Sequence, residues 1–231
     1  MKTDFGGKPL IVGCVGSEAR LRRCARQAPA DCDMVEVRLD LTGPCQGEWA
    51  GLCAAIRQRG MPVLLTIRDE SEGGRWSGRE AERLALYLAG LKSVSAVDVE
   101  IGAHALGLLV EAARRRGVKV VGSFHDFRGT PDLARLGRVE ARGRRMGADI
   151  VKIAAMVETP GDLARLMAVP AQATGPICVL GMGPLGAVSR VALPCAGSCL
   201  AYGALGKATA PGQLTCRALA KELARWGARK A

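Results

Sequence analysis

Short runs of apolar, mostly β-branched residues alternate with longer segments of helical periodicity along the whole chain. The run from 62 to 67 is almost entirely apolar, whereas apolar residues between Trp49 and Ile56 recur at i, i+3, i+4 and i+7, the spacing of one helix face. Strands that alternate with helices are typical of a parallel sheet, because parallel strands need long crossover connections. The pattern therefore predicts an α/β fold.

Eight strands are predicted in this way, each followed by a helical segment. They cover residues 10–15, 34–40, 62–67, 96–101, 118–124, 148–154, 176–181 and 198–202. Eight β/α units in a chain of 231 residues predict a (β/α)8 TIM barrel that forms a single domain over residues 1–231, near the compact end of the range for that fold. A doubly wound open sheet is the alternative.

Several helix boundaries are also predicted. Thr130-Pro131 and Thr159-Pro160 each place a capping hydroxyl before a proline in the first helical position. A short helix is expected near 187–191. The last helix is expected over about 213–226.

The composition is that of an ordinary globular protein, with 48% apolar and 24% charged residues. The excess of 33 basic over 22 acidic residues gives a net charge of +11, which favours anionic ligands of some kind. Nucleic-acid binding is one alternative, and it would weaken steeply with salt. An aromatic content of 3% argues against a protein that stacks bases on aromatic rings, and the basic residues are spread along helices.

Cysteine spacing and hydropathy narrow the class of protein further. The nine cysteines include no C-x-x-C pair, so neither a disulfide framework nor a zinc site is predicted, and a reducing cytoplasm is expected. No signal peptide is recognised at the N-terminus. The uncharged run 166–189 reaches membrane length but holds three prolines and four glycines, so a loop, a short buried strand and a loop are expected there instead.

Polar residues gather where the predicted strands end. In a barrel these ends meet at one rim, which is where the active sites of such enzymes lie. Residues 36, 38 and 40 are expected on one face of their strand by its period of two. The rim residues are Glu36, Arg38, Asp40, Thr66, Arg68, Glu72, Asp98, Glu100, Ser123, His125, Asp126, Lys152, Arg190 and Gln213.

Lys152 is the most informative of them, because it interrupts the apolar run D-I-V-K-I-A. A buried lysine without a role is costly. Burial and the cations at the rim would favour a neutral, nucleophilic amine suited to Schiff-base formation, whereas the carboxylates there would oppose it. A structural lysine paired with Glu36 or Glu100 is the other interpretation.

His125 lies in the segment G-S-F-H-D-F-R-G-T-P. Histidine can transfer protons near neutral pH, and Glu72 could orient it. A histidine that is simply hydrogen-bonded at a strand end is the alternative. Gly73-Gly74 could bend a loop over a ligand or make a turn. Arg190 follows a glycine-rich stretch and could hold a carboxylate with its two-pronged guanidinium.

With these residues in place, the chain resembles the type I 3-dehydroquinate dehydratases, the Schiff-base-forming dehydroquinases of the shikimate pathway. The motifs follow the family's order over roughly residues 10–213. They are V-E-V-R-L-D (35–40), T-I-R-D-E-S-E-G-G (66–74), D-V-E (98–100), S-F-H-D-F-R-G-T-P (123–131), G-A-D-I-V-K-I-A (147–154), M-G-P-L-G-A-V-S-R (182–190), G-S (197–198) and A-P-G-Q (210–213).

The resemblance implies a cytoplasmic homodimer that needs no metal or organic cofactor. It implies that Lys152 forms an imine with the C3 ketone of 3-dehydroquinate, that His125 moves the C2 proton to the departing C1 hydroxyl, and that Glu72 positions His125. The substrate-binding residues that it implies are Arg190 for the carboxylate, Gln213 and Thr209 on a closing loop, Glu36, Arg38 and Arg68 for the ring hydroxyls, and Met182 and Tyr202 beside the ring.

Four positions depart from the family pattern: Gly13 in place of a hydroxyl residue, Leu180 in place of methionine, Tyr202 in place of phenylalanine, and Thr209 in place of serine. Other functions remain open as alternatives. A class I aldolase would use the same lysine chemistry, although its substrate often carries phosphate and neither the Arg190 clamp nor His125 suits it. A non-catalytic protein that kept the fold is a second alternative, against which the intact Lys152, His125 and Glu72 argue.

Overall fold

Strands and helices alternate along the chain in the computed structural model, which describes residues 8–206 and 213–229. The strands are β1 (Leu10–Val15), β2 (Met34–Arg38), β3 (Val63–Thr66), β4 (Ala96–Glu100), β5 (Lys119–Asp126), β6 (Ile150–Met156), β7 (Ile177–Met182) and β8 (Leu200–Ala204). The α-helices are α1 (Glu18–Arg26), α2 (Leu39–Thr42), α3 (Trp49–Gln58), α4 (Glu80–Gly90), α5 (Leu106–Arg115), α6 (Leu133–Arg145), α7 (Pro160–Gln172), α8 (Gly186–Cys195) and α9 (Cys216–Arg225). Short 3₁₀ turns are η1 (Cys45–Gly47), η2 (Glu70–Glu72) and η3 (Leu91–Ser93).

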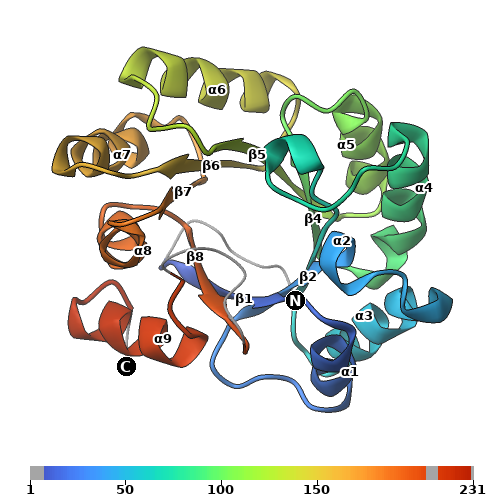
Figure 1. Ribbon diagram of the computed structural model, residues 1–231. Coiled ribbons are helices and arrows are strands. Elements are labelled where there is room, and N and C mark those ends of the chain that lie inside the picture. Colours follow the sequence, from blue (N-terminus) through green and yellow to red (C-terminus); the bar gives the residue numbers. More distant parts are fainter. Residues whose placement is uncertain (1–7, 207–212, 230–231) are drawn as a thin grey trace.

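The eight strands form one parallel sheet that curves into a nearly closed barrel surrounded by helices (Figure 1). The strand order is β7-β6-β5-β4-β3-β2-β1-β8, so the strands from β1 to β7 pair in the order in which they follow one another in the sequence. The first and last strands of the chain also pair, from Leu10 with Leu200 to Cys14 with Ala204. The predicted (β/α)8 barrel is therefore confirmed, and the open sheet is excluded.

The barrel closes differently between β7 and β8, where no strand ladder forms in the described residues. The Cys199 amide, just before β8, donates a backbone hydrogen bond to the Ile177 carbonyl of β7 at 2.8 Å. The Ser198 hydroxyl accepts a second one from the Val179 amide at 2.9 Å. A side chain thus takes the place of part of the missing ladder.

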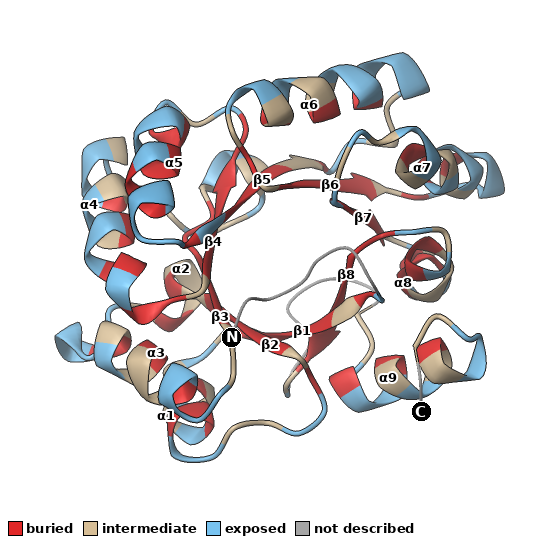
Figure 2. Ribbon diagram, turned by 180° about the vertical axis from the view of Figure 1, so that it is seen from behind, coloured by how far each residue is buried: buried red, intermediate tan, exposed pale blue. Residues whose placement is uncertain are grey.

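Apolar side chains fill two layers, one inside the barrel and one between the barrel and the helices. Figure 2 shows the strands as buried and the helices as buried mainly on their inward sides. The interior layer is formed by residues such as Val12, Met34, Leu64, Val121 and Ile150. This packing occupies the inside of the barrel toward the strand beginnings and leaves the opposite rim for polar groups.

The start of α7 shows how local sequence sets the helices. The Thr159 hydroxyl accepts from the Asp162 amide, the Asp162 carboxylate accepts from the Thr159 amide, and Pro160 fills the first turn. This reciprocal capping satisfies amides that the helix leaves unpaired. The prediction for Thr159-Pro160 is therefore confirmed.

The predicted cap at Thr130 is wrong. Helix α6 begins at Leu133, and the Asp132 carboxylate accepts from the Arg135 amide. Aspartate caps helices at least as well as threonine. The Thr130 hydroxyl donates instead to the Met156 carbonyl at 2.6 Å, so it is not available as a cap.

Other boundaries shift as well. The last helix starts at Cys216 after the Thr215 cap, and the helix expected near 187–191 extends over Gly186–Cys195. The uncharged run 166–189 begins inside α7 rather than in a loop. Among the described residues, no helix is both long and apolar enough to cross a membrane. All nine cysteines lie in the described ranges, and none forms a disulfide.

Candidate active site

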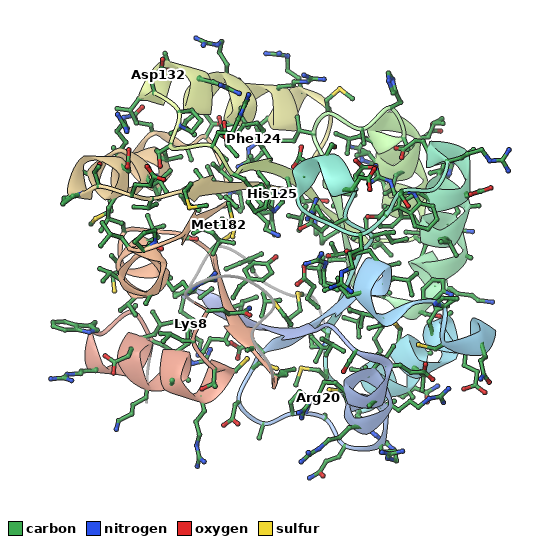
Figure 3. The ribbon with its side chains drawn as sticks, viewed as in Figure 1. Lys8, Arg20, Phe124, His125, Asp132 and Met182 are labelled. Atoms are coloured by element: carbon green, nitrogen blue, oxygen red, sulfur yellow. The ribbon has the colours of Figure 1, made fainter. Side chains whose placement is uncertain are left out.

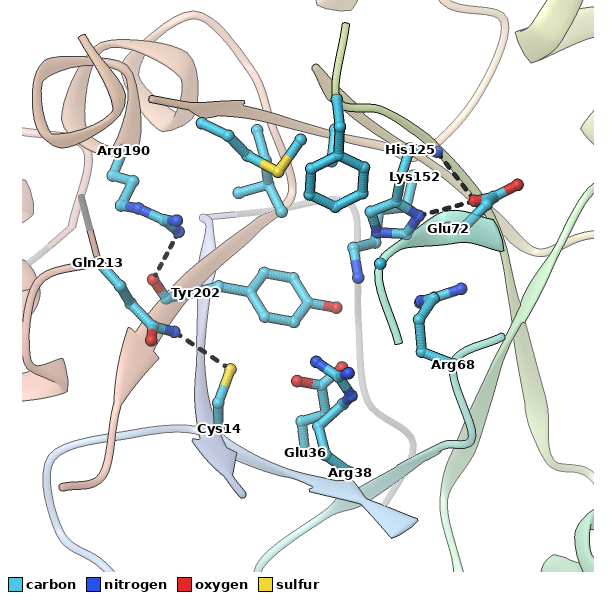
Figure 4. A pocket seen from close by; sticks show the side chains of 15 residues that line it. Cys14, Glu36, Arg38, Arg68, Glu72, His125, Lys152, Arg190, Tyr202 and Gln213 are labelled. Atoms are coloured by element: carbon cyan, nitrogen blue, oxygen red, sulfur yellow. Dashed lines mark hydrogen bonds and ion pairs between the residues drawn. The ribbon is translucent and has the colours of Figure 1, made fainter. Parts of the chain in front are cut away.

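A cavity of about 230 Å³ opens at the carboxyl ends of the strands. Of the eleven catalytic and substrate-binding residues that the resemblance implies, the ten in the described ranges all line it (Figure 4). The other predicted rim residues do not line it: Asp40, Thr66, Asp98, Glu100, Ser123 and Asp126. Thr209 lies outside the described residues. The full lining is Cys14, Glu36, Arg38, Arg68, Glu72, Gly73, His125, Phe127, Lys152, Ala154, Leu180, Met182, Arg190, Tyr202 and Gln213.

Lys152 comes from the middle of β6 and is almost fully buried, with 4% of its surface exposed. Its Nζ lies 2.9 Å from Oδ2 of Asp98 on β4 and 4.5 Å from the centre of the Tyr202 ring. The suggested structural pairing with Glu36 or Glu100 is therefore wrong. The amine stays in the cavity because β6 and β4 point the two side chains to the same inner face of the barrel.

Asp98 is the centre of a buried charge network that sequence reasoning left without a role. Its other oxygen, Oδ1, accepts from Arg68 at 2.6 Å and from Ser123 at 2.7 Å. Burial alone would raise the pKa of Asp98, but the charges of Arg68 and Lys152 hold that pKa far below its usual value. An ionised carboxylate therefore lies beside the amine, where it stabilises positive charge.

Arg68 binds the buried carboxylates of this network, whereas the resemblance implied that it binds ring hydroxyls of the substrate. Its Nη1 donates to Glu100 at 2.8 Å and to Ser123 at 2.6 Å, in addition to the contact with Asp98. Glu100 also accepts from Arg83 at 2.6 Å. The geometry gives Arg68 to the buried carboxylates, so its main contribution to the cavity is positive charge.

His125 and Glu72 form a close pair at the rim. Glu72 Oε2 lies 2.8 Å from His125 Nδ1 and accepts from the His125 backbone amide at 2.9 Å. With Glu72 ionised, Nδ1 carries a proton and Nε2 keeps its lone pair. Figure 3 shows His125 and Met182 on the inner side of the ring of helices, whereas Asp132 lies at its periphery.

Burial governs the protonation of this pair. It lowers the pKa of His125 well below 6.5, and the charges of Arg68 and Lys152 lower it further. Burial also raises the pKa of Glu72 to about 7, although Arg68 opposes the rise. The imidazole is therefore neutral near pH 7 and can accept a proton.

A turn built on two glycines carries Glu72 to this place. Gly73 ends η2 with a φ of +78°, a conformation that other residues rarely adopt. A side chain on Gly74 would collide with the Arg68 carbonyl oxygen. The structure thus shows the turn that was one interpretation of Gly73-Gly74, and Gly73 also lines the cavity.

The opposite side of the cavity is formed by Arg190 and Gln213 (Figure 4). Arg190 leaves α8 and is 3% exposed, and its Nη1 donates to the Tyr202 carbonyl at 3.3 Å. The Gln213 amide nitrogen lies 3.4 Å from the Cys14 sulfur. Two side chains that can bind an anion and a polar group thus face the Lys152 amine across the cavity.

Glu36 and Arg38 complete the rim, with one correction. Strand β2 ends at Arg38, and Asp40 lies in the helical turn α2 rather than on the same strand face. The Asp40 carboxylate binds the Arg38 guanidinium through two hydrogen bonds, at 2.9 and 2.6 Å. Asp40 therefore fixes the position of the Arg38 guanidinium. Glu36 is held by the Thr66 hydroxyl at 2.8 Å.

Cys14 is a cavity residue that sequence reasoning missed. The alternation along β1 turns Cys14 inward, whereas a side chain at Gly13 would meet Leu205 and Cys32 outside the barrel. The departure noted at Gly13 therefore does not reach the cavity. The signal that could have found Cys14 is the period of two, counted from the apolar residue Val12 that faces the barrel interior.

No cluster of three or more histidine, cysteine, aspartate or glutamate side chains suited to a metal ion occurs in the part of the chain that the structure describes. The cavity brings together a buried amine, a neutral imidazole with a carboxylate behind it, and an arginine. Such a set can form a covalent bond to a carbonyl group and move protons beside it.

The sequence matches one protein family and is similar to several curated relatives that share one enzyme name. The family model described as type I 3-dehydroquinase matches residues 12–228. The 3-dehydroquinate dehydratase of Methanococcoides burtonii is 33% identical over 224 residues, which cover 95% of each chain. The 3-dehydroquinate dehydratase of Methanosarcina barkeri is 35% identical over 222 residues, with 91% of each chain covered.

Solved structures are similar over the same length. The 3-dehydroquinate dehydratase of Geobacillus kaustophilus has a TM-score of 0.86 and 27% identity, covering 97% of this chain and 93% of its own. A type I enzyme of the same name from Clostridium difficile, solved with covalently modified comenic acid, has a TM-score of 0.84 and 27% identity over 94% and 92% of the two chains.

Proposed function

Because this chain belongs to the type I 3-dehydroquinase family, we propose that it dehydrates 3-dehydroquinate to 3-dehydroshikimate through an imine on Lys152, with His125 as general acid and base. It is thus a hydro-lyase of the shikimate pathway. The observation that supports this mechanism best is the buried amine of Lys152, which shares one cavity with the neutral His125 and its partner Glu72.

The first step joins the substrate to the enzyme. In its neutral form the Lys152 amine adds to the C3 ketone, and loss of water gives an imine that takes up a proton. Asp98, which lies 2.9 Å from the amine, then pairs with the positive charge on the imine nitrogen. Because this charge withdraws electrons, the C2 hydrogen next to the imine becomes acidic.

The second step eliminates water from C1 and C2. Neutral His125 takes the C2 proton, and the electron pair moves into the imine system. The resulting imidazolium gives its proton to the C1 hydroxyl, which leaves as water while a C1–C2 double bond forms. Water then hydrolyses the imine, which frees the product and restores Lys152. Glu72 keeps the imidazole in the required orientation throughout.

The remaining residues hold the substrate. Arg190 binds the carboxylate, and Gln213 contacts it from the neighbouring loop, together with Thr209. Glu36 and Arg38 bind ring hydroxyls, with Arg68 supplying charge behind them, while Met182 and Tyr202 lie against the ring. The role of Thr209 is inferred from the family alone, and the other assignments rest on the family and on the shared lining of the cavity.

Trapping with sodium borohydride tests the covalent step. Reduction of the protein in the presence of 3-dehydroquinate should add one substrate-derived mass, and peptide mapping should place it on Lys152. The experiment reads imine formation directly because borohydride reduces the C=N bond to a stable amine. An adduct on another lysine, or none from folded protein, would contradict the proposal.

The dependence of activity on pH follows from the His125–Glu72 pair. The pair must hold a neutral imidazole and an ionised carboxylate to remove the C2 proton, and burial raises the pKa of Glu72 to about 7. We expect kcat/KM to fall as the pH drops below about 7, because the pair then takes up a proton.

A Glu72→Gln variant separates the two groups. Its amide does not titrate, and the pKa of His125 lies below 6.5, so the acid limb of kcat/KM should move to lower pH while its maximum falls. The measurement is kcat/KM between pH 5 and 9 for both proteins. An acid limb that stays in place after the substitution would show that Glu72 does not set it.

We propose from the family that the protein is a homodimer in the cytoplasm. The nine unpaired cysteines support a reducing compartment. The carboxylate of the proposed substrate is an anionic ligand of the kind that the net positive charge favours. We therefore propose no nucleic-acid partner.

A further inference from the structure

The hydroxyl of Tyr202 stands out among the buried polar groups. Tyr202 lies on β8 with 4% of its surface exposed. Its hydroxyl oxygen is buried and has no hydrogen-bond partner among the described residues. No contact within the described part of the barrel therefore accounts for this oxygen.

A buried hydroxyl normally finds a partner, because leaving it unpaired costs free energy. The other buried tyrosine of the described chain follows this rule. The Tyr87 hydroxyl donates to the Asp98 carbonyl at 2.6 Å and accepts from the Ile67 amide at 2.9 Å. Tyr87 and Tyr202 thus form a natural pair for comparison, one satisfied and one not.

The direction of the Tyr202 side chain indicates where its partner binds. Figure 4 shows the ring crossing the cavity, with its hydroxyl end pointing away from Arg190 and toward the space between Lys152 and the Glu36–Arg38 pair. The ring itself lies beside the Lys152 amine, at 4.5 Å from ring centre to Nζ. The hydroxyl therefore points into the volume where a ligand attached to Lys152 would lie.

The hydroxyl can serve only as a neutral group. Burial raises the pKa of Tyr202 well above 10, and the charge of Glu36 adds to the effect. The phenol accordingly keeps its proton near neutral pH, and it can donate a hydrogen bond to an oxygen of the ligand.

We propose that the Tyr202 hydroxyl donates a hydrogen bond to a ring hydroxyl oxygen of the bound substrate, on the side of the ring away from the carboxylate, and that Tyr202 is therefore a specificity-determining residue. The identity of the ligand rests on the proposed function. Arg190 holds the carboxylate at one end of the cavity, so the ring hydroxyls face the end where the Tyr202 oxygen lies. A cavity built to bond a hydroxyl discriminates against ligands that lack it.

The test compares two ligands that have no ketone and so cannot form an imine. Quinate carries hydroxyls at C3, C4 and C5, on the side of the ring away from the carboxylate, whereas 1-hydroxycyclohexane-1-carboxylate keeps the C1 hydroxyl and lacks these three. Dissociation constants are measured by calorimetry for the wild type and for Tyr202→Phe. We expect the substitution to weaken quinate binding by roughly 3- to 10-fold and to leave the second ligand unchanged. The ratio of the two constants is thus the quantity that the hydroxyl controls.

Thermal unfolding without ligand gives an independent readout. Tyr202→Phe removes an unsatisfied hydroxyl, so Tm should rise by about 2–4 °C, whereas the matched Tyr87→Phe removes a satisfied one and should lower it by a similar amount. Higher stability together with weaker quinate binding would distinguish a ligand contact from a structural role.

Three results would overturn the proposal. They are an unchanged quinate constant in Tyr202→Phe, an equal loss for both ligands, and a wild-type protein that binds neither ligand. Neither ligand forms an imine, so a failure of the lysine chemistry would leave the ratio of the two dissociation constants unchanged. It would be seen instead in the borohydride experiment, as the absence of an adduct on Lys152.

Discussion

A Lys152→Ala protein is expected to lose at least about 10⁴-fold in kcat for 3-dehydroquinate and to give no adduct with borohydride. The substitution removes the atom to which the substrate would bond, so no protonated imine forms and the C2 hydrogen keeps its low acidity. Asp98 retains its hydrogen bonds to Arg68 and Ser123, which should keep the barrel folded. The measurement is the initial rate of product formation, with circular dichroism to confirm the fold.

Lys119→Ala is the matched control. Lys119 lies at the start of the neighbouring strand, where its side chain is 49% exposed and pairs with Asp149 at 2.7 Å. Its loss removes a lysine without touching the cavity and should leave the rate and the adduct unchanged. Normal turnover by Lys152→Ala would rule out covalent catalysis through this residue.

A His125→Ala protein should behave differently, because it keeps the nucleophile and loses the proton carrier. Imine formation should still occur, so borohydride should trap an adduct on Lys152, while kcat should fall by about 10²- to 10⁴-fold. The adduct should accumulate to a higher level before reduction than in the wild type, because its breakdown is slowed. Rapid-quench mass spectrometry measures both the amount and the rate.

His104→Ala provides the comparison, since His104 is the only other histidine of the sequence and lies exposed in the turn before α5. Its removal should change neither quantity. If His125→Ala dehydrated the substrate at the wild-type rate, another group would have to move the C2 proton, and the pairing with Glu72 would be structural.

The barrel could be predicted from the sequence because its signals are local and repeated. Each strand is a short apolar run bounded by turn residues. Because parallel strands need long crossover connections, the alternation of these runs with helical segments predicts a parallel sheet. Boundaries were less predictable where two caps compete. At the start of α6, Thr130 and Asp132 are both good caps, and the choice depends on the Met156 carbonyl, which comes from a different strand.

The members of the site were likewise predictable, but several of their contacts were not. Lys152, His125 and Glu72 are unusual residues at strand ends, and the fold brings them to one rim. Which carboxylate would face Lys152 depended on the stagger between β4 and β6, two strands that are not neighbours, so Asp98 could not be chosen over Glu100 or Glu36. The inward direction of Cys14 and the unpaired hydroxyl of Tyr202 depend on side-chain packing across the barrel, which local patterns do not report.

The incomplete closure between β7 and β8 also has a consequence for motion. The ladder runs from β7 at one end, through β1, to β8 at the other. Lys152 lies on β6, next to the β7 end, whereas Tyr202 lies on β8, at the opposite end. A substrate bonded to Lys152 and contacting Tyr202 would connect the two ends of the sheet across the gap between β7 and β8. Local opening of β8 away from β7 would then be less frequent in the occupied enzyme, because the ligand connects the two ends of the sheet. Amide hydrogen exchange along β8 should therefore slow down when the ligand binds.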